Sequence, residues 1–212
     1  MISKRYNKYL LESTYVGQIS YTFLIFTSKY GMTLVDQHAA HERILYEYFM
    51  SSYRYARENN SYIHLKKNNK IILNQTYFSI IRKNISIIDE IGFNISVEEK
   101  NTIHLRSHLS CYKNYSLEQF IKLFVKEFNN VTDYSIIKYN FIKAYSQQKA
   151  CRSSWKSGFV ITRKYASQIQ YNLNKISNNS HCPHGRPIMH FIHIKDLLKY
   201  FCRRNCSAPF DI

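Results

Sequence analysis

The sequence predicts an α/β protein of the α+β type, in which a smaller α+β lobe is inserted between two halves of a larger subdomain. Two strand-like runs lead into a helical pattern near the start, and helices with one short strand return in the last third. The middle of the chain is more polar and carries helix and strand patterns of its own. A length of 212 residues suits one domain with such an insertion and allows a sizeable core.

The first half of the larger subdomain is predicted to contain two strands and a helix. Residues 17–27 and 32–35 favour strands, and "SKYGM" favours a hairpin turn at Gly31. From residue 38 to about residue 53, apolar side chains recur four apart, which is the spacing of one helix face. We therefore expect a strand to end at Asp36 and a helix to begin at His38.

The insertion is predicted to cover residues 54–140. Within it, "TYFSIIRKNISIIDEIGF" has helical spacing and ends at Gly92, a residue suited to a helix C-cap. The segment "NISVEEKNTIHLRSHL" has the pattern of two paired strands. An amphipathic helix, "SLEQFIKLFVKEFNN", is predicted to open at Ser116.

The larger subdomain resumes over residues 141–212 and completes residues 1–53. A helix is expected over "YNFIKAYSQQKACRSSWKSG", ending at Gly158, and another over residues 163–176. In "SNNSHCPHGRPIMHFIHI" a polar turn restricted by Pro and Gly precedes a strand. The segment "KDLLKYFCRR" is predicted to be a short final helix.

Composition indicates a globular, intracellular protein. Hydrophobic residues make up 45% of the chain, which excludes a disordered protein. No apolar run approaches the ~18 residues of a membrane span, and the first residues lack the apolar core of a signal peptide. The five cysteines are an odd number, which argues against a disulfide framework.

The strongly basic balance points to a polyanionic partner. A net charge of +16 attracts nucleic acid above all. The alternative is compositional bias, because abundant Lys, Asn, Ile and Tyr are typical of an AT-rich genome.

A first group of candidate metal ligands lies in "VDQHAAHERILYE". Asp36 precedes the predicted helix, where a carboxylate caps free amides or binds a metal. His38 and Glu42 are four apart and share a helix face. Glu47 is about half a turn away and points elsewhere, at the right spacing for an ion pair with Arg43. The alternative interpretation of the group is a capped, charged surface helix.

A second group lies in "HCPHGRP". Cys182 and His184 are separated by one residue, so in an extended segment their side chains share a side. The neighbouring prolines and glycine restrict the backbone, and a thiolate with an imidazole suits Zn²⁺. The alternative is a buried cysteine and a surface histidine beside a turn.

Taken together, the two groups offer five ligands for one or two metal ions, provided that the two halves of the chain pack together. Mixed carboxylate, imidazole and thiolate ligands suit a catalytic site better than a closed structural one. Two metal ions in such a site clamp the attacking and leaving oxygens of a phosphodiester.

Two further sets of residues are candidates for phosphate or metal binding, but ordinary core or surface positions explain them equally well or better. In "KACRSSWKSG", Arg152 beside Cys151 is placed to hold a phosphate or a ligand carboxylate, although an exposed basic helix fits equally well. Trp155 is expected in a core or an interface. A set of two cysteines and two histidines near the end matches no zinc pattern, so core or surface positions are expected for Cys202, Cys206, His190 and His193.

These motifs resemble the C-terminal domain of the MutL family of DNA mismatch repair proteins. "DQHAAHERILYE" fits the family's endonuclease motif DQHA-x2-E-x4-E at Asp36, Gln37, His38, Ala39, Glu42 and Glu47. "ACR" at residues 150–152 and "CPHGRP" at residues 182–187 look like the second and third family motifs. The resemblance runs from about residue 15 to residue 201, and its middle part is recognisable only by placement.

The resemblance implies a homodimer that nicks DNA with the help of metal ions. Residues 1–53 and 141–212 would form the dimerisation and endonuclease subdomain, and residues 54–140 the regulatory one. The implied cofactors are Mn²⁺ (or Mg²⁺) and Zn²⁺, and the implied partners are DNA and a MutS-type mismatch sensor. The implied location is the bacterial cytoplasm, at the nucleoid.

The matching positions carry implied roles at the site. Asp36, His38 and Glu42 would be catalytic. The implied metal ligands are Asp36, His38, Glu42, Cys182 and His184. The implied supporting residues are Gln37, Glu47, Cys151, Arg152 and Arg186.

Two departures from the family pattern limit what the resemblance implies. Motifs of the GHKL-type ATPase are not found, so the expectation is a fragment or a separately encoded C-terminal half. The sliding-clamp motif Q-x-L-L-x-P has only a degenerate counterpart, "NKIILN" at residues 69–74, which disfavours clamp binding.

Two other functions remain as alternatives. One is a non-catalytic dimerisation and partner-docking module. The other is a basic nucleic-acid-binding protein with one structural zinc, which leaves the Asp36–Glu42 group unexplained.

Overall fold

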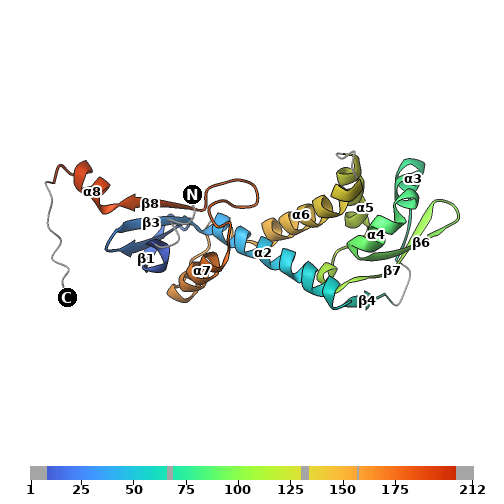
Figure 1. Ribbon diagram of the computed structural model, residues 1–212, viewed down its shortest axis with the longest axis horizontal. Coiled ribbons are helices and arrows are strands. Elements are labelled where there is room, and N and C mark those ends of the chain that lie inside the picture. Colours follow the sequence, from blue (N-terminus) through green and yellow to red (C-terminus); the bar gives the residue numbers. More distant parts are fainter. Residues whose placement is uncertain (1–8, 66–68, 130–133, 157, 204–212) are drawn as a thin grey trace. The chain divides into compact units, whose positions relative to one another are not determined.

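The computed structural model describes residues 9–65, 69–129, 134–156 and 158–203. Helices and antiparallel strands are both abundant, which confirms the α+β class (Figure 1). The chain forms two compact units, Met1–Leu45 with Ala150–Ile212, and Tyr46–Lys149. The unit boundaries fall inside helices α2 (Gln37–Glu58) and α6 (Tyr134–Ser153), whereas the sequence placed the insertion at 54–140.

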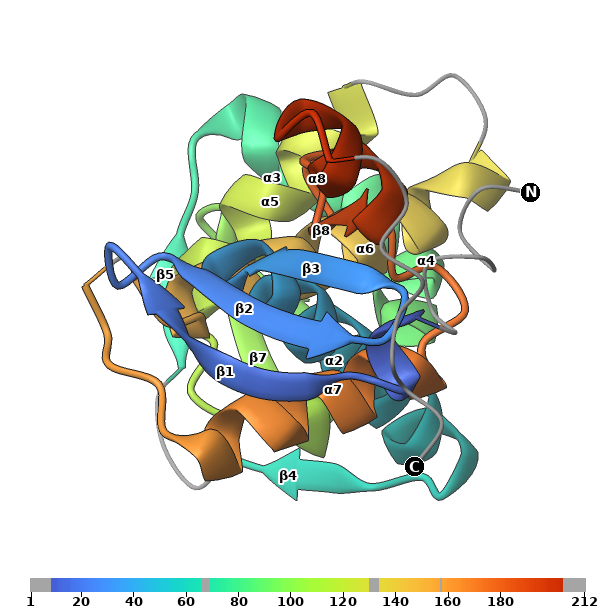
Figure 2. The same cartoon turned by 90° about the vertical axis from the view of Figure 1, so that its left-hand side faces the viewer.

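The first unit is built on one antiparallel sheet. Its strand order is β1-β2-β3-β8, so the last strand of the chain pairs with the third (Figure 2). The strands are β1 (Thr14–Ile19), β2 (Phe23–Ser28), β3 (Gly31–Asp36) and β8 (Met189–His193). This pairing brings the segment before β8 next to the residue that ends β3, because Asp36 N donates to Ile188 O over 2.9 Å.

The prediction of one strand over residues 17–27 was wrong. The chain turns between β1 and β2, where Ser20 and Tyr21 both have φ of +48°. Thr22 N donates to Ile19 O over 2.9 Å and closes this turn. Two consecutive positive φ values are the geometry of a two-residue hairpin turn, which usually contains Gly or Asn. Ser-Tyr lacks that signal, so the apolar run on both sides resembled one continuous strand.

Gly31 is required by the close pairing of β3 with β8. Its φ is +146°, and a Cβ atom there would lie 2.1 Å from Ile192 O. No other residue fits without moving the β8 backbone.

The core of the first unit lies between its sheet, the start of α2 and helix α7 (Arg163–Lys175). Helix α7 begins at the predicted place, and the Thr162 side chain caps it by accepting from Tyr165 N. The buried apolar residues are Leu10, Leu24, Phe26, Val35, Ala39, Ala40, Ile161, Ala166, Ile169, Leu173, Cys182 and Ile188. One predicted metal ligand, Cys182, is therefore also part of this core.

The second unit contains a sheet with β7 (Thr102–Leu109) at its centre. Strand β6 (Phe93–Glu98) pairs along β7 to form the predicted strand pair. Strands β4 (Tyr62–His64) and β5 (Lys70–Ile72) pair with opposite ends of β7.

The helices of the second unit differ in one place from the prediction. The helix expected before Gly92 is two helices, α3 (Gln75–Lys83) and α4 (Ile85–Ile91), with a break at Asn84. Asn84 Nδ2 donates to Ile80 O over 2.7 Å, so this side chain competes with the helical backbone bonds. Gly92 is the predicted left-handed C-cap, with φ of +106°.

An aromatic core joins the helices of the second unit to its sheet. Helix α5 (Leu117–Asn129) forms as predicted and buries Phe120, whose ring stacks on Phe93 with centroids 4.1 Å apart. Phe93 also contacts Tyr112, with centroids 4.5 Å apart, and Phe141 of α6 meets Phe120 edge to face.

Two elements near the end of the chain complete the fold. Helix α6 ends at Ser153, before the predicted limit at Gly158, and α8 (Ile194–Tyr200) is the predicted final helix. Cys206 lies outside the described residues. In the described part of the chain, no helix is long and apolar enough to cross a membrane.

Candidate metal centre

The start of α2 is fixed by the residue that ends β3. Asp36 Oδ1 accepts a hydrogen bond from Ala39 N over 2.9 Å, so the carboxylate caps the helix. The helix therefore begins at Gln37, directly after the strand. Asp36 is half-buried in this position.

The "HCPHGRP" segment forms a tight loop against α2. Cys182 N donates to Arg186 O over 2.8 Å, and Gly185 N donates to Cys182 O over 2.9 Å. Gly185 has φ of +86°, which this turn requires. Arg43 Nε of α2 donates to His181 O over 2.7 Å and fixes the loop to the helix.

Three predicted ligands converge where this loop meets α2. Donor atoms of Glu42, Cys182 and His184 all lie within 4.8 Å of one another. Glu42 and Cys182 are each 2% exposed, whereas the His184 side chain is 40% exposed. The group therefore has one side open to solvent.

The donor set fits a divalent metal ion. Glu42 Oε1 is buried and accepts no hydrogen bond, although His184 Nδ1 lies 3.1 Å away, because the geometry of that contact is not that of a hydrogen bond. Cys182 Sγ accepts a hydrogen bond from His184 N over 3.4 Å. One oxygen, one sulfur and one nitrogen donor suit Zn²⁺ with a fourth position left for a non-protein ligand.

The other two predicted ligands do not join this three-residue group. The His38 ring lies against the segment after α6, with Nδ1 2.7 Å from Trp155 O and 3.2 Å from Ser154 Oγ. Donation from Nδ1 to the carbonyl leaves the Nε2 lone pair available to a ligand. The carboxylate of Asp36 is used as the helix cap. Metal binding by these two residues stays a prediction.

His41 is a site residue that sequence reasoning missed. Its Nδ1 accepts from Trp155 N over 3.0 Å, and its ring lies on the indole with centroids 3.8 Å apart. Burial, followed by the nearby His38, lowers the pKa of His41 to about 4. His38 and His41 thus hold the carbonyl and the amide of the same residue. The only signal in the sequence was a second histidine three residues after His38, near the start of α2.

The side chain of Gln37, the first residue of α2, is hydrogen-bonded to residues of β1 and of the turn that follows it. Its side chain is fully buried, and Nε2 donates to Tyr21 O over 2.8 Å. Its Oε1 accepts from Gln18 Nε2, while Gln18 also bonds to Phe159 O and Ile161 N. Gln37 therefore supports the start of α2 and does not contact the donor group directly.

The remaining predicted supporting residues are not among the three converging donors. Cys151 is half-buried, and its carbonyl accepts from Lys156 Nζ over 2.8 Å. Arg152 and Arg186 are exposed. Glu47 belongs to the other compact unit. Trp155 packs against the first core, as expected.

The structure describes three of the four cysteines and histidines near the end of the chain that matched no zinc pattern. Cys202 and His190 are exposed, and His193 caps α8 by accepting from Lys195 N over 3.0 Å. Within the described ranges they form no group of three close metal donors.

Comparison with known families decides the class of protein. The model of the MutL C terminal dimerisation domain matches residues 16–160, which is more than half of the chain. The chain belongs to this family. The match contains the start of α2 and the end of α6, and the loop at residues 180–188 follows it.

Curated relatives extend the similarity over most of this MutL-type domain. It is 31% identical over 193 residues to the DNA mismatch repair protein MutL of Ligilactobacillus salivarius, covering 89% of this chain and 28% of that protein. It is 26% identical over 189 residues to the DNA mismatch repair protein MutL of Endomicrobium trichonymphae, covering 89% of this chain and 31% of that protein. The chain thus spans less than a third of the curated relatives it matches.

Proposed function

We propose that this MutL-type domain acts in DNA mismatch repair, homodimerises, and nicks DNA by metal-dependent hydrolysis of a phosphodiester. Family membership supports the repair role and the dimer. The observation that carries the nicking proposal is the convergence of Glu42, Cys182 and His184 from two distant segments. A cation at the site would offset the cost of burying the Glu42 Oε1 atom, which accepts no hydrogen bond and has His184 Nδ1 3.1 Å away.

The chain supplies the ligands and the positive surface around them. Glu42, Cys182 and His184 would hold the metal, with Asp36 at the end of β3 and His38 on the first turn of α2. A bound divalent ion would activate water and offset the charge that develops on the phosphate. Arg152 and Arg186 are exposed and lie in the two other motifs, where their guanidinium groups would hold phosphate oxygens of the DNA.

The proposed cofactors and partners follow from the same site. Zn²⁺ suits the group with a thiolate, and Mn²⁺ or Mg²⁺ suits oxygen-rich ligands such as Asp36. DNA is the proposed substrate, consistent with the net charge of +16. A MutS-type mismatch sensor is the proposed partner, and the proposed location is the bacterial cytoplasm at the nucleoid.

A second candidate function is a dimerisation and docking module without nuclease activity. The observation that favours it is that three, not five, of the predicted ligands lie together. In that case the group would hold a single structural zinc ion.

Incubation with supercoiled plasmid and Mn²⁺ tests the proposal. We expect open circles from the wild-type chain and none from Glu42→Gln, which keeps the shape of the side chain but lacks its charge. Glu99→Gln, at an exposed position in the other unit, serves as the charge-matched control and should nick normally. A dimer in sedimentation without any nicking, at DNA concentrations that saturate binding, would leave the docking function as the correct one.

A further inference from the structure

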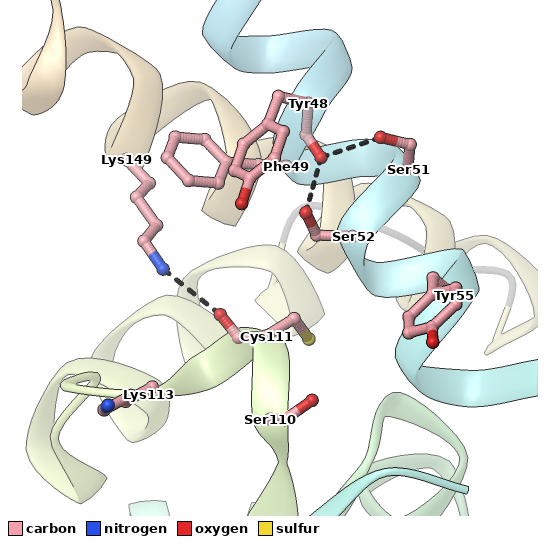
Figure 3. Close-up of a pocket in the computed structure, with 9 residues that line it drawn as sticks. All are labelled: Tyr48, Phe49, Ser51, Ser52, Tyr55, Ser110, Cys111, Lys113 and Lys149. Atoms are coloured by element: carbon pink, nitrogen blue, oxygen red, sulfur yellow. Dashed lines mark hydrogen bonds between the residues drawn. The ribbon is translucent and has the colours of Figure 1, made fainter. Parts of the chain in front are cut away.

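A pocket of about 550 Å³ lies wholly within the second unit, and none of its lining residues is a proposed metal ligand. It is formed by the second half of α2, the short turn at Ser110–Tyr112 and α6 (Figure 3). The lining residues are Tyr48, Phe49, Ser51, Ser52, Tyr55, Ser110, Cys111, Lys113 and Lys149. Its volume is in the range of roughly 300–1,000 Å³ that suits a small ligand.

The charge of the pocket is entirely positive. Lys113 and Lys149 are the charged lining residues, and the lining contains neither Asp nor Glu. In Figure 3 both lysines lie on one side of the pocket, opposite Tyr55. A concave surface with two ammonium groups and no carboxylate favours an anionic ligand.

Lys149 is held in place by neutral groups. Its Nζ donates to Cys111 O over 3.1 Å and to Tyr145 Oη over 2.8 Å, and lies 4.9 Å from the centre of the Phe49 ring. An ammonium group has three donors, so one N–H remains for a ligand beyond these two bonds. Partial burial lowers the pKa of Lys149, and a bound anion would offset that cost of desolvation.

The serine hydroxyl groups divide into acceptors and a donor. Ser51 Oγ and Ser52 Oγ donate to Tyr48 O over 2.9 Å and 2.8 Å, so their oxygens can only accept from a ligand. Ser110 Oγ accepts from Ser61 Oγ over 2.9 Å, which leaves its own hydrogen available to donate. Acceptors for N–H groups therefore lie along α2, and the Ser110 hydroxyl is a donor that points towards the Tyr55 side of the pocket in Figure 3.

Aromatic rings on α2 provide a surface for a flat ligand. Tyr48 is 61% exposed and Tyr55 is 67% exposed, so both rings are accessible. They stand on the same helix as Phe49 and the two serine acceptors (Figure 3). A flat heterocycle would stack on such rings, as bases do on exposed aromatic side chains.

We propose that this pocket binds a nucleoside phosphate, with the phosphate on the side of Lys113 and Lys149 and the base against the tyrosines of α2. The ligand is either a free nucleotide or one nucleotide of a DNA strand, because both offer the same phosphate and ring. This binding site is independent of the metal centre, which lies in the other unit.

Calorimetry on the full chain, with no divalent metal present, tests the chemistry of the ligand. The probes are deoxyadenosine monophosphate, deoxyadenosine and inorganic phosphate. We expect the monophosphate to bind about tenfold more tightly than either fragment, because each fragment lacks one of the two sets of contacts. Equal binding of deoxyadenosine and its monophosphate would overturn the proposal, as would no binding of the monophosphate.

Paired variants locate the binding. Lys113→Gln should weaken monophosphate binding about threefold to tenfold, whereas Lys122→Gln, at an exposed α5 position outside the pocket, should not. Tyr55→Ala should weaken it similarly, with Tyr139→Ala as the control because Tyr139 is 57% exposed in the same unit. Equal losses in a pocket variant and its control would overturn the proposal.

Competition identifies the source of the nucleotide. A short single-stranded oligonucleotide that displaces a fluorescent monophosphate at lower concentration than free monophosphate would identify a DNA strand as the ligand. Weaker displacement would identify a free nucleotide. Retained nicking of plasmid by Lys113→Gln would leave the proposed nuclease function standing, so the two proposals fail separately.

Discussion

The imidazole Nδ1 of His184 lies 3.1 Å from the buried Oε1 atom of Glu42, although the two residues belong to segments near opposite ends of the chain. The pairing of β3 with β8 brings these segments together, because it places the loop before β8 beside the first turns of α2. The proposed chemistry of the first unit therefore depends on the order of the strands in its sheet.

Zinc should stabilise the protein through Glu42. Saturating Zn²⁺ at 100 times its dissociation constant should raise the free energy of unfolding by about 2.7 kcal/mol. Glu42→Gln replaces a charged donor with a neutral amide oxygen, so most of that gain should be lost, while Glu99→Gln should keep it. Thermal unfolding with and without Zn²⁺ measures the difference. An unchanged zinc effect in Glu42→Gln would show that the ion binds elsewhere.

Trp155 should matter for stability more than its partial exposure indicates. The centroid of the indole lies 3.8 Å from that of the His41 ring. The indole also stacks on the Phe159 ring, with centroids 5.4 Å apart. We expect Trp155→Ala to cost about 2–3 kcal/mol and Trp155→Phe to cost less, because Phe keeps a ring in the stack. Urea unfolding followed by circular dichroism gives both values. Equal losses for the two variants would contradict a role for stacking.

Gly31→Ala should be strongly destabilising, and Gly158→Ala should not. Both glycines have positive φ, but a Cβ atom on Gly31 would lie 2.1 Å from Ile192 O, whereas nothing lies within 4 Å of one on Gly158. Gly158→Ala should cost about 1 kcal/mol from backbone conformation alone. Gly31→Ala should cost several times more because β8 must shift. Similar urea midpoints for the two variants would show that β8 moves at little cost.

Stability should fall above pH 9 because several buried thiol and phenol groups of the second unit, Cys111 and Tyr53 among them, stay protonated in the folded chain. Burial raises the pKa of the Cys111 thiol from 9.0 to about 12 and that of the Tyr53 phenol from 10.0 to about 12. Below pH 9 both groups are protonated in folded and unfolded chains, so their effect is constant. Above pH 9 the unfolded chain releases protons first, and stability is lost progressively up to about pH 12.

Urea unfolding at pH 7, 9 and 10.5 tests this dependence. In Cys111→Ala the loss of stability between pH 9 and pH 10.5 should be smaller, because the contribution of this thiol is gone. A loss of the same size in both proteins would contradict the assignment to Cys111.

Long periodic helices and the capped segments could be predicted from the sequence. The apolar spacing of residues 38–53 predicted α2, because a helix face repeats every three to four residues. Gly92 predicted the end of α4, because the left-handed conformation of a C-cap favours glycine. The turn at Ser20 and Tyr21 could not be predicted, since neither residue type signals positive φ. The break at Asn84 likewise depends on a side-chain bond to Ile80 O that periodicity does not encode.

Three of the five predicted metal ligands could be found from the sequence, but the hydrogen bonds that position the site could not. The motifs indicated Glu42, Cys182 and His184, which the structure brings together. The roles of His41 and Arg43 depend on backbone atoms of Trp155 and His181, far away in the sequence. Such bonds use groups that every residue carries, so no residue pattern reveals them.

The buried amide of Gln37 also has a consequence for how the site is assembled. Because its bonds to Tyr21 O and Gln18 fix the first residue of α2, the neighbouring Asp36 and His38 lose their freedom when the polypeptide folds and not when a cation arrives. Among the three converging donors of the proposed metal site, His184 is the one whose side chain faces the solvent from which an ion would enter.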